Sequence, residues 1–90
     1  MEIKWQVDSE VLSSKIDDEA ILMSIEADSY FGLDPVGSRI WEILSAEAKT
    51  MDELVALLME EYEVEEKQCR EDVSHFVEDM ENRKLIRQVG

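Results

Sequence analysis

The chain has 90 residues, 44% of them hydrophobic, and its nine basic and 23 acidic side chains give a net charge of −14. A chain of this length buries roughly 60–65% of the surface that it would expose when unfolded, which leaves room for one core but not for a deep catalytic cavity as well. We therefore expect residues 1–90 to form one domain. The negative charge disfavours nucleic acids and anionic membranes as partners, and it fits a solvated acidic surface or a partner with a basic segment.

The sequence contains one cysteine, Cys69, which excludes an internal disulfide and a cysteine-based zinc site. No apolar run approaches the roughly 20 residues that cross a membrane. The segment Met1–Gln6 lacks the basic and apolar stretches of a signal peptide. These features predict a cytoplasmic protein.

The first third of the chain predicts β-strands. Val11–Ile16 is β-prone, Ala20–Ile25 is a short apolar run, and the polar residues 17–19 between them suit a hairpin connection. Ser29–Leu33 is a third, aromatic-rich strand, and residues 2–7 add a further extended segment. A hairpin with one more strand is about the smallest sheet that is stable when a helix packs on it.

The rest of the chain predicts three helices. Asp34 as an N-cap and Pro35 at the first helical position start a helix that runs to about residue 46. Thr50 and Glu53 form a capping box for a second helix, and an apolar stripe predicts a third helix over residues 65–82. We expect an α+β fold with a winged helix-turn-helix-like outline, in which a three-stranded antiparallel sheet is followed by three helices and an apolar tail closes the core.

Catalytic groups are sparse. His75, the only histidine, lies off the centre of the apolar face of the third predicted helix, and Cys69 lies six positions earlier, near the opposite side. A Cys–His dyad is therefore geometrically poor, and we interpret His75 as a surface residue and Cys69 as a small apolar residue of the core or of a groove. The three glycines are too scattered for a phosphate loop, and residues 17–19 lack the spacing of a calcium loop. We expect no catalysis, no metal and no cofactor.

The third predicted helix argues against nucleic-acid binding. A winged-helix protein reads base edges with Arg, Lys, Asn or Gln from its last helix, which lies close to the phosphates. Residues 65–82 carry seven acidic and two basic side chains, a net charge of −5. That charge repels phosphates, so nucleic acid is not an expected partner.

A peptide is the remaining kind of partner. An edge strand offers unpaired N–H and C=O groups to which an extended peptide can add. Ser29–Leu33 is the candidate edge strand, and Gly32 leaves room for another backbone to approach. Tyr30 and Phe31 point to opposite faces of this strand, so either one can line a groove while the other packs in the core, or both can complete the core.

The segment Asp28–Leu44 resembles the central signature of PqqD-like proteins. In that family a strand leads into a helix that carries a glycine and then an Ile-Trp-Glu block, and the resemblance covers residues 11–86. The matching positions are Gly37, Ile40, Trp41, Glu42 and Leu44. The Asp34–Pro35 pair departs from many relatives but still caps the helix.

This resemblance implies a RiPP recognition element, a winged-helix-like domain that binds the leader segment of a ribosomally made precursor peptide and performs no chemistry itself. The leader adds to the third strand, lies against the third helix, and is presented to a separate modifying enzyme. Free-standing members serve pyrroloquinoline quinone and lasso-peptide pathways. The Tyr-Phe-Gly-Leu-Asp-Pro run is more similar to lasso-type members, whose partner is a leader-processing cysteine protease; a radical enzyme of the pyrroloquinoline quinone type is the next choice.

The resemblance also implies a peptide-binding site shared by the strand and the third helix, in which Arg70 and Asp72 set a polar register. Gly37 is interpreted as permitting close helix packing, and Trp41 as a scaffold residue. The predicted site residues are Ser29, Tyr30, Phe31, Gly32, Leu33, Cys69, Arg70, Asp72, Val73, Phe76 and Val77.

An alternative from another class is an acidic winged-helix protein that acts as an interaction or regulatory module without binding a leader. Binding of a basic partner by such a module would depend strongly on salt and would need no extended peptide.

Overall fold

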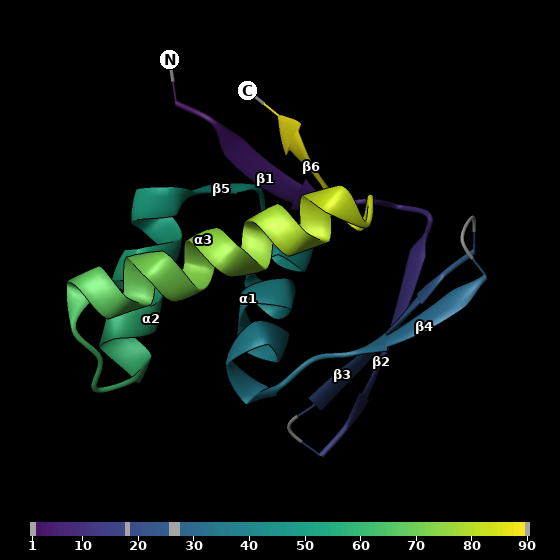
Figure 1. Cartoon of the computed structure of the whole chain (residues 1–90), viewed down its shortest axis with the longest axis horizontal. Helices are drawn as coiled ribbons and strands as arrows, with labels where there is room; N and C mark the ends of the chain where they lie inside the picture. Colours follow the sequence, from purple (N-terminus) through teal and green to yellow (C-terminus); the bar gives the residue numbers. More distant parts are fainter. Residues whose placement is uncertain (1, 18, 26–27, 90) are drawn as a thin grey trace.

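The computed structural model describes residues 2–17, 19–25 and 28–89, and it confirms the α+β class with three strands followed by three helices (Figure 1). Further strands at both ends of the chain and before the second helix add a second sheet, which the sequence reasoning did not predict. The elements in order are β1 (Lys4–Val7), β2 (Val11–Ile16), β3 (Glu19–Ser24), β4 (Ser29–Gly32), α1 (Pro35–Ala46), β5 (Lys49–Thr50), α2 (Met51–Glu61), α3 (Glu66–Asn82) and β6 (Ile86–Val89).

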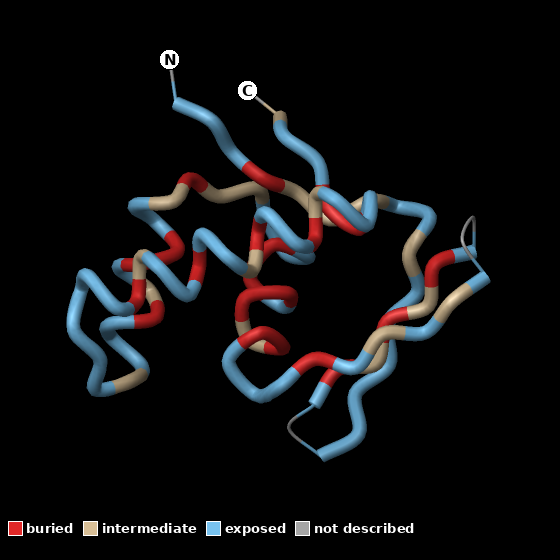
Figure 2. The backbone as a smooth tube through the Cα atoms, in the orientation of Figure 1, coloured by how far each residue is buried: buried red, intermediate tan, exposed pale blue. Residues whose placement is uncertain are grey.

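The predicted sheet is present as β2-β3-β4, with every neighbouring pair antiparallel. Asp17 adopts a positive φ of 58° in the hairpin turn, a conformation that Asp tolerates better than most residues; its neighbour Asp18 lies outside the described residues. Ala20, Leu22 and Ser24 alternate along β3 and are buried, so this face of the sheet packs on the core (Figure 2).

The second sheet has the order β5-β1-β6 and joins the two ends of the chain. Residues 2–7 were expected to be extended, and β1 in this segment pairs with β6 in the register Lys4↔Val89 and Val7↔Ile86. The predicted apolar tail is buried as expected, because Leu85 is inaccessible to solvent and Ile86 is 3% exposed. The indole N–H of Trp5 donates to Glu81 Oε1 over 2.9 Å, which ties β1 to α3.

The helices begin where the sequence predicts. Asp34 Oδ1 accepts a hydrogen bond from the Gly37 N–H over 2.7 Å at the start of α1. The capping box is complete at the start of α2: the Glu53 N–H donates to Thr50 Oγ1, and the Thr50 N–H donates to Glu53 Oε1. No helix in the described part of the chain is both long and apolar enough to cross a membrane.

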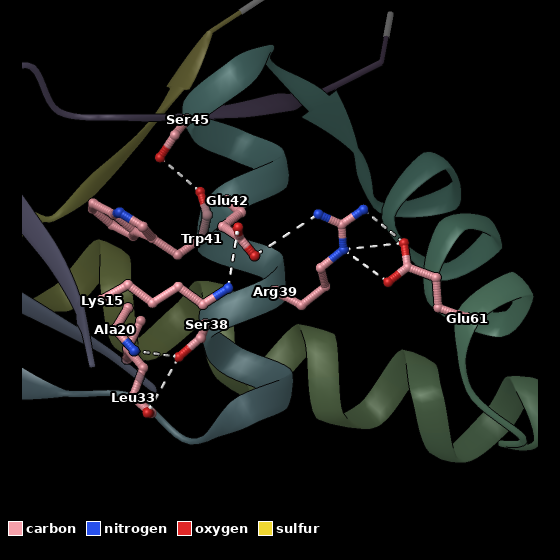
Figure 3. A network of polar contacts seen from close by, with 9 residues as sticks. All are labelled: Lys15, Ala20, Leu33, Ser38, Arg39, Trp41, Glu42, Ser45 and Glu61. Carbon is pink, nitrogen blue, oxygen red and sulfur yellow. Dashed lines mark hydrogen bonds and ion pairs between the residues drawn. The ribbon is translucent and has the colours of Figure 1, made fainter. Parts of the chain in front are cut away.

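One contiguous core lies between the helices and the inner faces of both sheets (Figure 2). Trp41 is 3% exposed at the centre of α1, which confirms its interpretation as a scaffold residue. On the surface, Arg39 of α1 pairs with both carboxylate oxygens of Glu61 in α2, at 2.8 and 3.0 Å from Nε (Figure 3). The core and this ion pair hold α1 and α2 together, and α1 in turn supports β3.

We predict that Thr50→Ala lowers the free energy of unfolding by about 1 kcal/mol, because the first turn of α2 loses an N-cap acceptor. Urea denaturation followed by circular dichroism measures this change. The matched control is Ser74→Ala, which removes an exposed hydroxyl from the middle of α3 and should not lower stability. Equal losses from both substitutions would contradict a capping role for Thr50.

Candidate functional site

β4 is an open edge of its sheet. It pairs with β3 on one side, and no strand within residues 2–17, 19–25 or 28–89 pairs with it on the other. An edge of this kind presents backbone donors and acceptors to whatever approaches it.

The register shows which backbone groups face outward. The Leu33 N–H donates to the Ala20 carbonyl over 2.9 Å, so Leu33 and Ala20 are a hydrogen-bonded pair. Hydrogen-bonded and non-hydrogen-bonded pairs alternate along an antiparallel ladder, and Tyr30 and Gly32 therefore stand in the non-hydrogen-bonded pairs. Their N–H and C=O groups point away from β3, toward the open side.

The two aromatic residues of β4 lie on opposite faces, and the structure resolves which is which. Phe31 is half-buried on the inner face, where the Arg83 guanidinium carbon lies 4.8 Å from the centre of its ring. This stacking links β4 to the C-terminal end of α3. Tyr30 is 70% exposed on the outer face.

Gly32 is not required by the packing of this chain. A Cβ built at this position meets no atom within 4 Å, and the residue does not have a positive φ. The space beside β4 is therefore open at Gly32, as an approaching backbone needs.

A cleft of about 520 Å³ lies beyond the end of β4, between the start of α1 and the middle of α3. Its lining combines three apolar side chains, Val36, Ile40 and Phe76, with acidic ones. Its lining residues are Asp34, Val36, Gly37, Ile40, Asp72, His75, Phe76 and Asp79.

Gly37 of α1 lies against the Phe76 ring of α3 at this cleft. A Cβ at Gly37 would lie 3.2 Å from Cε2 of Phe76 and 3.1 Å from Oδ1 of Asp34. These distances are tighter than ordinary contacts, so a larger residue would push the Phe76 ring away. The absence of a side chain at Gly37 therefore leaves room for the Phe76 ring against α1.

The three aspartates of the cleft accept hydrogen bonds within the chain, Asp34 and Asp72 through Oδ1 and Asp79 through both carboxylate oxygens. Asp34 Oδ1 caps α1, Asp72 Oδ1 accepts from the Gln68 amide over 3.0 Å, and Asp79 pairs with Arg83 over 3.1 Å. A carboxylate can accept several hydrogen bonds, so each retains capacity for a donor on a ligand.

The helix residues predicted for the site separate into three groups. Asp72 and Phe76 line the cleft. Arg70 instead faces α2, where its Nη2 lies 2.8 Å from Asp52 Oδ1, and it also pairs with Glu66. The remaining three are core residues, between 0 and 4% exposed: Cys69, Val73 and Val77.

Burial raises the pKa of the Cys69 thiol, and the nearby Asp72 carboxylate raises it further. The thiol is therefore protonated near pH 7, and a protonated thiol is a poor nucleophile.

Sequence reasoning did not assign six of the residues that line the cleft to the site: Asp34, Val36, Gly37, Ile40, His75 and Asp79. One signal was available on α3, since Asp72, His75, Phe76 and Asp79 recur at helical spacing and share one face. In the sequence of α1, no local pattern distinguishes the residues that line the cleft from those that face only the core.

Ser38 connects this site to the fold. Its buried hydroxyl accepts from the Ala20 N–H over 2.7 Å and donates to the Leu33 carbonyl over 3.3 Å (Figure 3). In the Ala20–Leu33 pair the Leu33 N–H donates directly to the Ala20 carbonyl, whereas the Ser38 hydroxyl of α1 bridges the Ala20 N–H and the Leu33 carbonyl. The end of β4 is fixed to the helix that lines the cleft.

The profile of the family described as Coenzyme PQQ synthesis protein D (PqqD) matches residues 19–86. This chain belongs to the PqqD family. A comparison with curated proteins gave no significant match.

Two solved structures resemble this PqqD-family chain over nearly its whole length. "TbiB1 in Complex with the TbiA(beta) Leader Peptide" has a TM-score of 0.84 and 35% sequence identity, and the alignment covers 91% of this chain and 94% of that one. "Lasso peptide synthetase B1 complexed with the leader peptide" has a TM-score of 0.80 with coverage of 92% and 96%. Its identity of 18% supports the shared fold only.

We predict that Ser38→Ala lowers the free energy of unfolding by about 1–3 kcal/mol, since the buried Ala20 N–H and Leu33 carbonyl both lose their partner. Thermal or urea denaturation measures the loss. Ser45→Ala is the matched control on the same helix, because the Ser45 hydroxyl donates only to the Trp41 carbonyl of its own helix. If the two variants are equally stable, Ser38 does not couple β4 to α1 as described.

Proposed function

We propose that this chain binds the leader segment of a ribosomally synthesised precursor peptide as an added strand on β4. The observation that carries the proposal is the open edge of β4, where Tyr30 and Gly32 direct their backbone groups outward. An edge of this kind takes up an extended peptide through main-chain hydrogen bonds, and nearby pockets select its side chains.

The similar structures support this proposal. TbiB1 is 35% identical over nearly the full length and is described as a complex with a leader peptide. A shared fold alone would not identify the ligand. The sequence identity with TbiB1 and the coverage of both chains together favour the same class of ligand here. The lasso-type setting is the one that we propose first.

The proposed site consists of the β4 edge, Ser29–Leu33, and the cleft with Asp72 and Phe76. A leader side chain on the inner face of the extended sheet would lie toward Phe31 and α3. Val36 and Phe76 in the lining of the cleft favour an apolar or aromatic leader residue. Cys69, Val73 and Val77 would support this surface from the core rather than touch the peptide.

We further infer that residues 1–90 act as one recognition domain that holds the leader for a separate enzyme, a leader-processing cysteine protease first and a radical enzyme next. The domain itself would perform no chemistry, and the raised pKa of the Cys69 thiol supports that assignment. Precursor peptides are made on ribosomes, so the proposal puts their capture in the cytoplasm.

We predict that Gly32→Pro weakens binding of the leader about tenfold. The substitution removes one outward N–H, a hydrogen bond worth about 1 kcal/mol, and its ring crowds the added strand. Fluorescence anisotropy with a labelled synthetic leader measures the affinity. Proline with its N–H side facing outward is tolerated on an edge strand, so the fold should persist.

The matched control is Ser13→Pro, on the opposite edge of the same sheet. Ser13 stands opposite the buried Leu22, whose backbone groups bond toward β4, so the Ser13 N–H also faces outward. The proposal requires this variant to bind the leader normally. Equal affinity of the Gly32→Pro variant and the unaltered protein would refute strand addition at β4.

A further inference from the structure

Arg83 lies over the inner face of β4, at the C-terminal end of α3. Its guanidinium carbon is 4.8 Å from the centre of the Phe31 ring, and Phe31 is the half-buried inner residue of the edge strand. Nε of Arg83 donates to both carboxylate oxygens of Asp79, one helical turn earlier, over 3.1 and 3.2 Å. The aromatic ring and the carboxylate together hold the guanidinium at a defined place beside β4.

The terminal nitrogens of Arg83 are not used in this arrangement. Neither Nη atom makes a hydrogen bond within residues 2–17, 19–25 and 28–89, and the side chain is 45% exposed. Arg39 and Arg70 differ, because Nη2 of each lies 2.8 Å from a carboxylate oxygen on α2. Arg83 therefore presents its Nη donors to a ligand while its position is fixed by the chain.

A strand added to β4 would bring a side chain to these donors. Tyr30 and Gly32 direct their N–H and C=O groups toward the open side, and the added residue between them stands opposite Phe31. Residues that stand opposite each other share a face of the sheet, with Cβ atoms about 4.5–5.5 Å apart. The side chain of this added residue therefore lies on the inner face, within reach of Arg83, whichever way the peptide runs.

A carboxylate is the group that suits these donors best. The planar fork of an arginine matches the two oxygens of a carboxylate, and such charge-assisted pairs are the strong class of hydrogen bond. Arg70 shows that one arginine of this chain can serve two carboxylates, since its Nη2 lies 2.8 Å from Asp52 and 3.3 Å from Glu66. Arg83 holds Asp79 through Nε and keeps its Nη donors for a second carboxylate.

The local charge favours an anionic group, although the chain as a whole carries −14. Residues 83–90 include three cations, Arg83, Lys84 and Arg87, and no acidic side chain. Exposed charges that are more than about 8 Å apart are largely screened at physiological ionic strength. A ligand carboxylate at contact distance from Arg83 is therefore governed by its near neighbours more than by the net charge.

We propose that Arg83 is a specificity-determining residue that pairs with an acidic side chain of the leader, at the leader position opposite Phe31. This inference rests on the proposed function and adds a chemical requirement on the ligand. A glutamate or aspartate at that position gains a charge-assisted pair, whereas a lysine there meets the like charge of Arg83.

The first test compares Arg83→Gln with the control Arg87→Gln. Both substitutions remove one positive charge from an exposed arginine of the same segment, and Arg87 lies on β6 in the other sheet. Fluorescence anisotropy with a labelled synthetic leader measures the affinity of each variant. The Arg83→Gln variant should bind about five- to tenfold more weakly than the unaltered chain, and the Arg87→Gln variant within about twofold.

A double-mutant cycle then finds the leader residue that Arg83 contacts. Each acidic residue of the synthetic leader is replaced in turn by its amide, and each peptide is titrated against the unaltered chain and the Arg83→Gln variant. One replacement should weaken binding to the unaltered chain about five- to tenfold and change binding to the variant by less than about twofold. A leader with lysine at that position should bind an Arg83→Glu variant more tightly than the unaltered chain, which a merely structural role of Arg83 would not produce.

Three results overturn the inference: equal affinity of the unaltered chain and the Arg83→Gln variant for the leader, additive effects of every amide replacement and Arg83→Gln, or a cognate leader without any acidic side chain. The proposed function fails differently. A leader that binds the unaltered chain and is weakened by Gly32→Pro but not by Arg83→Gln removes the inference alone. A leader that does not bind the unaltered chain removes both.

Discussion

The hydroxyl of Ser38 is the contact on which the geometry of the site depends. It completes the Ala20–Leu33 pair from within α1, so the last residues of β4 cannot move independently of the helix that lines the cleft. Two backbone groups that would otherwise be buried without partners are satisfied by one side chain, and leaving them unsatisfied would be costly. The position of the open edge of β4 relative to the cleft is consequently fixed, and a site for an extended ligand needs such preorganisation.

The two faces of the small sheet have different surroundings. The inner face packs on α1 and meets α3 through the Arg83–Phe31 contact, and it fixes where β4 lies. The outer face keeps apolar side chains in solvent, although this chain is acidic and small. A peptide that adds to the edge of such a sheet would place alternate side chains on the two faces, one set toward α3 and the other toward solvent.

Much of this arrangement was predictable from the sequence, for local physical reasons. Asp34–Pro35 and the Thr50–Glu53 capping box mark helix starts through short-range hydrogen bonds, and both helices begin there. The pairing of β1 with β6 was not predictable, because it joins segments at opposite ends of the chain and no local pattern encodes it. The face of α3 was only partly predictable: Phe76 lines the cleft, but whether Arg70 turns to the strand or to Asp52 depends on how α2 packs.

Hydrogen exchange at the β4 amides tests the central claim most directly. In the free protein the Tyr30 and Gly32 amides face outward and should exchange quickly, while the Phe31 amide, which faces β3, should be protected. Addition of the leader should slow exchange at Tyr30 and Gly32 and leave Phe31 little changed. If the leader binds and the Tyr30 and Gly32 amides exchange as quickly as before, the peptide does not add to β4 and the account is wrong.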